Sequence, residues 1–146
     1  MNLIPDEYHS DGRSPVLIYQ YERTRAALDS MARAGKPHPA HGFKLRYANP
    51  ATGKHPFPTM AVSMQRLPAG FAGKSYRSTG SAVFAVHRGE GSARIGDKEF
   101  KIGAHDVFVA TPWQPYSFAA DSELELFSYS DRAGQEALGY WREQLD

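Results

Sequence analysis

The sequence contains no cysteine, which excludes disulfide bonds, thiolate nucleophiles and metal sites built on cysteine. It also has no apolar run near the ~20 residues that a membrane-spanning helix needs. Its N-terminus lacks the basic stretch and apolar core of a signal peptide. Its 17 basic and 16 acidic side chains leave a formal net charge of +1, which gives no reason to expect binding to nucleic acid or a membrane. We therefore expect a cytoplasmic protein.

The composition is ordinary for one soluble globular domain. The chain has 146 residues, within the ~100–200 usual for one domain, and can bury about 68–70% of its unfolded surface. Hydrophobic residues make up 41% of the sequence and charged residues 23%, both common values for a globular protein. We therefore expect a single domain with a core of its own.

Residues 70–127 organise the chain, because short apolar segments alternate there with turn residues. The segments are rich in valine, isoleucine and phenylalanine, as strands are. They cover Val83–Val86, Ala93–Ile95, Phe100–Ile102, Val107–Ala110 and Leu124–Phe127. Between two of them, Gly96-Asp97 predicts a type II′ hairpin turn, because glycine accepts a positive φ at the first central position. Many short strands at near-regular spacing predict an all-β barrel or sandwich.

The segments before this stretch are mixed. Residues 1–14 are polar and rich in turn formers, which predicts an arm without regular structure, and 15–19 form a short apolar run. Apolar side chains on one face predict a helix over 21–34. Strands are expected over 43–47 and 59–67, the second because apolar and polar residues alternate along it.

A final helix is expected after the last strand. Asp131 is a natural N-cap for a helix over 133–144, whose Leu138 and Trp141 would dock on the barrel wall. The predicted division of this single domain is an N-terminal arm and helix over 1–42, a barrel over 43–130 and a C-terminal helix over 131–146.

A spacing pattern in the strand-rich stretch resembles the first motif of the cupins, which are small jelly-roll β-barrels. That motif is a glycine, five residues, His-x-His, three or four residues, a glutamate, six residues and a second glycine. Here Gly70 and Gly89 occupy the two glycine positions. Tyr76, Ser78 and Ala82 stand where the family has its two histidines and its glutamate.

Further segments extend the resemblance to one cupin family. The second cupin motif would place another histidine shortly after a proline, and here Pro112 is followed by Tyr116. The chain also resembles gentisate 1,2-dioxygenase, and more narrowly its C-terminal half, over 45–53, 64–70, 127–131 and 137–140. The resemblance implies a jelly-roll barrel. It also implies a family with two cupin domains per chain that cleaves a dihydroxybenzoate ring with Fe(II) and O₂.

The residues at the implied ligand positions are poor ligands for iron. Neutral imidazoles suit Fe(II), whereas a tyrosine must first lose a proton with a pKa near ~10. We therefore expect no metal, no Fe(II) cofactor and no catalytic residue in this chain, and a barrel mouth filled by side chains. The candidates for a pocket at that mouth, which could hold a small aromatic ligand, are Tyr76, Ser78, His87, Trp113 and Tyr116.

Other polar residues are weaker candidates. Arg77 and Arg94 could hold a carboxylate through two hydrogen bonds each, although arginines on strands more often face solvent. His38 and His41 are interpreted as members of a solvated, proline-containing loop. His105 could simply pair with the aspartate beside it at a turn.

The leading hypothesis is a structural and assembly module similar to the C-terminal, metal-free half of a gentisate 1,2-dioxygenase. Such a module would form a homodimer or bind a partner cupin chain. Two alternatives remain open. One is a metal-free barrel that binds a small aromatic molecule. The other is an active dioxygenase that uses unconventional ligands such as His87 or His105.

Overall fold

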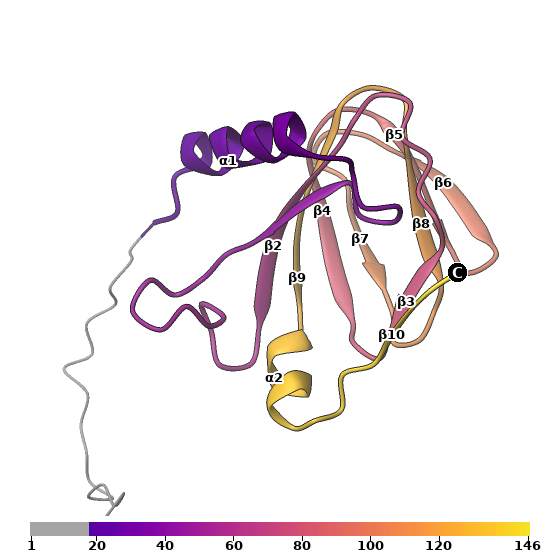
Figure 1. Ribbon diagram of the computed structural model, residues 1–146. Coiled ribbons are helices and arrows are strands. Elements are labelled where there is room, and N and C mark those ends of the chain that lie inside the picture. The colour runs from indigo at the N-terminus through magenta and orange to yellow at the C-terminus, as the bar shows by residue number, and fades with distance from the viewer. Residues whose placement is uncertain (1–17) are drawn as a thin grey trace, which may run out of the picture.

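The computed structural model describes residues 18–146 as two antiparallel five-stranded sheets, with one helix before the first strand and a short helix before the last strand (Figure 1). The first sheet contains, in spatial order, β1 (Phe43–Arg46), β2 (Ala61–Leu67), β9 (Leu124–Ser130), β4 (Ala82–Arg88) and β7 (Val107–Ala110). The second contains β10 (Glu143–Leu145), β3 (Tyr76–Ser78), β8 (Tyr116–Ala120), β5 (Gly91–Ile95) and β6 (Lys98–Ile102). The all-β prediction is confirmed. The predicted arm over 1–14 and most of the apolar run over 15–19 lie outside the described residues.

Alternation along the strands places one apolar face of each sheet in the interior. Phe84 on β4 and Phe118 on β8 are almost fully buried, and their ring centroids lie 5.1 Å apart at 70°, an edge-to-face contact between the two sheets. The β5–β6 hairpin turns at Gly96-Asp97 as predicted. Gly96 has a φ of +57°, which is the conformation that required glycine there.

The N-terminal helix α1 (Tyr21–Ala34) has the predicted bounds and lies across the outer face of the first sheet (Figure 1). Leu28 is completely buried and packs with Phe43 and Met64 in a second apolar cluster, apart from the barrel core. β2 therefore turns Met64 towards the helix, while Ala61 and Leu67 face the barrel interior. The outer face of the first sheet is therefore apolar where Leu28 packs against it.

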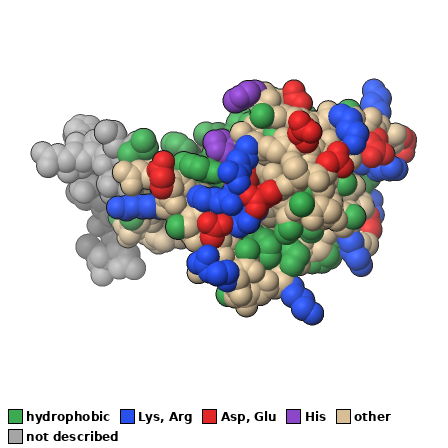
Figure 2. All heavy atoms as spheres, turned by 90° about the horizontal axis from the view of Figure 1, so that it is seen from above, with side chains coloured by type: hydrophobic (Ala, Val, Ile, Leu, Met, Phe, Trp, Pro, Cys, Tyr) green, Lys and Arg blue, Asp and Glu red, His purple; other side chains and the backbone are tan. Residues whose placement is uncertain are grey.

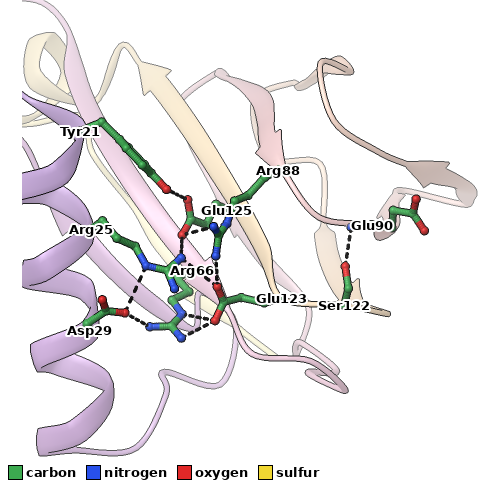
Figure 3. A network of polar contacts seen from close by, with 9 residues as sticks. All are labelled: Tyr21, Arg25, Asp29, Arg66, Arg88, Glu90, Ser122, Glu123 and Glu125. Atoms are coloured by element: carbon green, nitrogen blue, oxygen red, sulfur yellow. Dashed lines mark hydrogen bonds and ion pairs between the residues drawn. The ribbon is translucent and has the colours of Figure 1, made fainter.

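A network of ion pairs also joins α1 to the barrel. Seen from the side of the helix, basic and acidic side chains gather at the centre of the surface (Figure 2). Figure 3 shows the members that bridge the helix and three strands: Tyr21, Arg25, Asp29, Arg66, Arg88, Glu123 and Glu125. Three arginines face three carboxylates, so the network is balanced in charge.

Glu125 is the centre of this network because it is completely buried on β9. It lies directly opposite Arg66 on β2 and Arg88 on β4 in the strand register. The Tyr21 hydroxyl donates a hydrogen bond to its Oε2 at 2.7 Å, and Arg25 Nη1 pairs with its Oε1. Burial alone would raise the pKa of the neighbouring Glu123, but hydrogen bonds from three arginines outweigh burial and lower its pKa to about 2.

The C-terminal segment differs from the prediction of a long helix. α2 covers only Arg132–Ala137, Gly139 takes a left-handed conformation with φ of +74°, and the chain then adds β10 to the edge of the second sheet. Leu138, expected to dock on the barrel, is 67% exposed. β10 forms in place of a longer helix because its backbone pairs with β3. This pairing extends to the Asp146 N–H, which donates a hydrogen bond to Ser75 O at 3.0 Å. Within residues 18–146, no helix is both long and apolar enough to cross a membrane.

Candidate functional site

The barrel interior is packed at one end and hollow at the other. The packed end contains Phe108, Phe118, Leu124 and their neighbours. The other end holds a cavity of about 620 Å³, walled by both sheets, the loop over 36–42 and the C-terminal segment. The expectation that side chains fill the barrel mouth is therefore wrong, and the space is large enough for a small molecule.

Three of the five predicted pocket residues lie together on the cavity wall. Tyr76 and Ser78 share the inner face of β3, and Tyr116 on β8 is directly opposite Tyr76 in the strand register. The two tyrosine ring centroids are 5.5 Å apart at 70°. The Tyr76 hydroxyl donates a hydrogen bond to Glu143 Oε2 at 2.6 Å. The strand spacing that suggested these residues therefore brings their side chains to one place.

The two phenols of this wall stay protonated. Burial raises the pKa of Tyr76 well above its usual range, and the hydrogen bond to Glu143 raises it further. Burial is also the main cause of the raised pKa of Tyr116, with the Glu143 carboxylate adding to it. Both side chains are consequently neutral hydroxyl groups at physiological pH, able to donate a hydrogen bond but not to act as phenolate ligands.

The charged residues of the cavity were not predicted from the sequence. Four basic side chains and one carboxylate lie on its wall: Lys36, Lys44, Arg46, Arg132 and Glu143. The ammonium group of Lys44 has no hydrogen-bond or ion-pair partner among residues 18–146. Burial lowers the pKa of Lys44 to about 8, and the charge of Arg132 lowers it further. The inward position of Lys44 could have been predicted from its neighbours. Phe43 and Leu45 both face α1, so alternation along β1 turns Lys44 towards the barrel interior.

Two histidines and a tryptophan also lie on the cavity wall. His38 and His41 stack with ring centroids 4.9 Å apart, and His41 meets the ring of Tyr76 edge-on at 4.4 Å. Both line the cavity; His38 is exposed, as expected for a solvated loop, whereas His41 is partly buried. Burial, followed by the charge of Lys44, lowers the pKa of His41 to about 3, so its imidazole is neutral. Trp141 lies below the Arg132 guanidinium, 4.6 Å from Cζ to the ring centroid.

The other two predicted pocket residues, His87 and Trp113, lie elsewhere. On β4 the buried Phe84 and Val86 face the barrel interior, so alternation turns His87 outwards, where its ring centroid lies 4.5 Å from that of Tyr21. Trp113 is 45% exposed at a turn, where its φ is +61°, and the Arg77 guanidinium lies over its ring. Neither side chain contributes to the cavity wall.

Arg77, Arg94 and His105, which were weaker candidates, also lie outside the cavity. Arg77 pairs with Asp146 at 3.5 Å, and Arg94 pairs with Glu99 at 2.6 Å on an exposed part of β5. His105 sits in an exposed turn with φ of +77°. The alternative of unconventional metal ligands at His87 or His105 therefore gains no support, since the two side chains face solvent.

Comparisons with known proteins show that this chain is similar to part of several 1,2-dioxygenases. No model of a known protein family matches the chain. It is 45% identical over 143 residues to gentisate 1,2-dioxygenase 1 of Aquipseudomonas alcaligenes, a match that covers 97% of the chain and 41% of that protein. It is 36% identical to 1-hydroxy-2-naphthoate 1,2-dioxygenase of Nocardioides sp. strain KP7, over 92% of the chain and 35% of that protein.

Solved structures agree with the sequence matches. A variant of salicylate 1,2-dioxygenase from Pseudoaminobacter salicylatoxidans superposes with a TM-score of 0.83 at 31% identity, covering 88% of the chain and 39% of that enzyme. This chain is a cupin related to the gentisate and salicylate 1,2-dioxygenases. The cupin spans about 40% of the length of the curated relatives that it matches.

The iron of that enzyme family does not fit the donors of this cupin. The family's ligand positions hold Tyr76, Ser78 and Tyr116, and the glutamate position holds Ala82, all four on the cavity wall. Both phenols are protonated, and the Tyr76 hydroxyl already donates to Glu143. A serine hydroxyl and an alanine add no strong ligand, because Fe(II) prefers imidazole and carboxylate groups. Among residues 18–146, no group of three histidine or acidic side chains converges on a point where a metal could bind.

Proposed function

We propose that this cupin is a non-catalytic barrel that supports the folding and assembly of a ring-cleaving dioxygenase, in the manner of the C-terminal cupin of a gentisate 1,2-dioxygenase. Two findings support the proposal. The chain matches gentisate 1,2-dioxygenase along nearly its whole length while covering 41% of that enzyme. Its barrel also keeps the spacing of the cupin motif while the ligand positions carry protonated hydroxyl groups and a methyl group.

The donor set at the barrel mouth is the single observation that carries this proposal. A ring-cleaving site needs a metal that can bind the substrate and O₂ together, so at least two or three protein ligands must hold it. Tyr76 and Tyr116 would each have to give up a proton that burial and Glu143 hold in place. The barrel therefore lacks the chemistry of the reaction while retaining the fold.

Purified protein, loaded with excess Fe(II) and then dialysed, is expected to hold well under one equivalent of iron and to leave gentisate unoxidised. Iron is measured by elemental analysis, and gentisate oxidation by oxygen uptake. A matched positive control is Tyr76→His combined with Ser78→His and Tyr116→His, which restores imidazoles at the implied positions and is expected to increase retained Fe(II) at least tenfold. One equivalent of iron retained by the unmodified chain would refute the proposal.

The outer face of the first sheet supports the proposed role in assembly. Val62, Tyr129, Val83 and Val109 form one row across four strands in the strand register. Val107 is 65% exposed and Val109 is 48% exposed, beyond the part that α1 covers. Contiguous exposed apolar side chains of this kind are typical of protein–protein contacts. We infer that two copies of the chain pack through this face, because one self-complementary patch suffices for a two-fold dimer.

Light scattering is expected to give a dimer mass, twice the 16.2 kDa of one chain. Val107→Glu combined with Val109→Glu is expected to give the monomer mass, because four buried carboxylates would have no partners across the interface. Lys98→Glu, on an exposed strand of the other sheet, is the matched control and should remain dimeric. A monomer of the unmodified chain at high concentration would contradict the homodimer and favour a different partner chain.

A further inference from the structure

A series of polar contacts runs from an exposed loop to the wall of the barrel cavity. The loop over 48–60 joins β1 to β2 and lies against α2. We propose that this loop regulates the cavity, because protonation of His55 in the loop changes how firmly Glu136 on α2 holds Arg132 at the cavity wall. The relay consists of these three residues and Glu143. The inference goes beyond the assembly role and does not depend on it, since every contact of the relay lies within one copy of the chain.

His55 fixes the loop to α2. Its Nε2 atom lies 2.8 Å from Glu136 Oε2, and its side chain is only 12% exposed. The Gly134 N–H donates a hydrogen bond to Thr59 O at 3.3 Å, which is a second attachment of the loop to the helix. A neutral imidazole makes an ordinary hydrogen bond with a carboxylate, whereas a protonated imidazole makes a charge-assisted bond that is roughly twice as strong. The contact between His55 and Glu136 therefore strengthens when the imidazole gains a proton.

Glu136 divides its two oxygen atoms between the loop and the cavity wall. Its Oε1 accepts a hydrogen bond from Arg132 Nε at 2.7 Å, while its Oε2 faces His55. Burial would raise the pKa of Glu136, but hydrogen bonds from His55 and Arg132 outweigh burial and lower that pKa. A lowered pKa keeps Glu136 charged as the pH falls towards about 5. A positive charge on His55 then competes with Arg132 for the same carboxylate.

Arg132 has a second carboxylate within reach on the cavity side. Its Nη1 lies 3.8 Å from Glu143 Oε2, the oxygen that accepts the Tyr76 hydroxyl at 2.6 Å. At 3.8 Å this contact is an ion pair without a hydrogen bond. The guanidinium also stacks on the Trp141 ring. Protonation of the loop weakens the outer contact of Arg132 and so favours this inner one.

The position of Arg132 matters to the cavity because its charge reaches the ionisable groups there. Burial is the larger cause of the lowered pKa of Lys44, and the charge of Arg132 adds to it. Movement of the guanidinium towards Glu143 would change the field that Lys44 experiences. The loop and the cavity are therefore two sites joined by one side chain with two alternative carboxylate partners, and coupling between two sites requires such an element.

The emission of Trp141 measures the position of Arg132, because a cation over an indole ring interacts with its π-system. Trp113→Phe leaves Trp141 as the only tryptophan of the chain. Emission is recorded between about pH 5 and 7.5, where histidine ordinarily titrates and Lys44, with a pKa of about 8, is still largely charged. The charged groups that face His55 come from three elements: Arg46 on β1, Lys54 in the loop, and Arg132 and Glu136 on α2.

The emission of the Trp113→Phe chain is expected to titrate with pH. Adding His55→Gln, which keeps a hydrogen-bonding side chain but takes up no proton, is expected to abolish the titration, and Glu136→Gln should do the same. His105→Gln, in an exposed turn, is the matched control and should retain it. A titration that survives His55→Gln would assign the response to another group and overturn the proposal, as would a level emission in the Trp113→Phe chain.

The coupling must also appear in reverse, because linkage between two sites is reciprocal. If protonation of His55 favours the contact of Arg132 with Glu143, removing the Glu143 charge disfavours the protonated loop. Glu143→Gln is therefore expected to lower the titration midpoint of the His55 ring, followed by proton NMR, by about 0.3 pH unit, a twofold loss of proton affinity.

Direct loss of a negative charge would shift the midpoint in the same direction, so the comparison is repeated in Arg132→Gln. The shift is expected to vanish there. A shift that persists without Arg132 would mean that Glu143 acts on the loop through space, and it would overturn the relay. If Arg132→Gln or Glu143→Gln fails to fold, the emission titrations with and without His55 still decide the matter.

Discussion

Glu125→Gln is expected to lower the free energy of unfolding by about 3–5 kcal/mol, the usual cost of removing one partner from a buried ionic network. Glu125 is completely buried on β9, between Arg66 and Arg88 on the flanking strands, and it receives Arg25 and the Tyr21 hydroxyl from α1. Glutamine has nearly the same shape but no charge. The substitution therefore leaves three arginines facing two carboxylates.

Urea unfolding measures this cost, and Glu99→Gln provides the matched control. Glu99 pairs with Arg94 on an exposed strand, where both side chains are more than half exposed. Exposed ion pairs contribute about 0–1 kcal/mol, because water screens them and the side chains lose freedom when they pair. If the two substitutions cost the same, the network of α1 would be no more than a surface feature, and the docking of the helix would depend on Leu28 and its apolar neighbours alone.

The parts of the fold that could be predicted are those specified by local sequence. The 3.6-residue spacing of apolar side chains gave α1 its bounds, and Gly96 located the β5–β6 turn. The C-terminal segment could not be predicted in the same way. Its apolar spacing suits a helix, but β10 forms because the edge of β3 offers backbone partners more than 60 residues away in sequence. Gly139, in its left-handed conformation, was the local sign that the helix ends early.

The cavity was predictable only where one strand contributes two residues. Tyr76 and Ser78 share a face by simple alternation, and the motif spacing added Tyr116. Lys44, Arg132 and Glu143 come from three different elements, so only the assembled barrel brings them together. His87 could have been placed by the same alternation, because the inward-facing Phe84 and Val86 on β4 turn it to the outer face.

The two glycines of the cupin spacing should differ sharply in what they tolerate. Both have a positive φ, +77° at Gly70 and +89° at Gly89, so alanine is strained at either position. At Gly70 nothing lies within 4 Å of a new Cβ atom. At Gly89 that atom would meet the carbonyl oxygen of Glu123 at 2.1 Å and Leu124 Cα at 2.8 Å. The backbone at the start of β9 would have to move, and it carries the ionic network.

Gly89→Ala is therefore expected to cost about 3–5 kcal/mol in urea unfolding, which combines the strain of a positive φ with a forced backbone shift. Gly70→Ala, the matched control, is expected to cost only about 1–2 kcal/mol, from the strained φ alone. Equal costs would mean that the close approach of the two chain segments relaxes easily. A large difference would explain why the spacing of the motif persists in a barrel whose ligand positions hold no imidazole: the backbone packing itself requires Gly89.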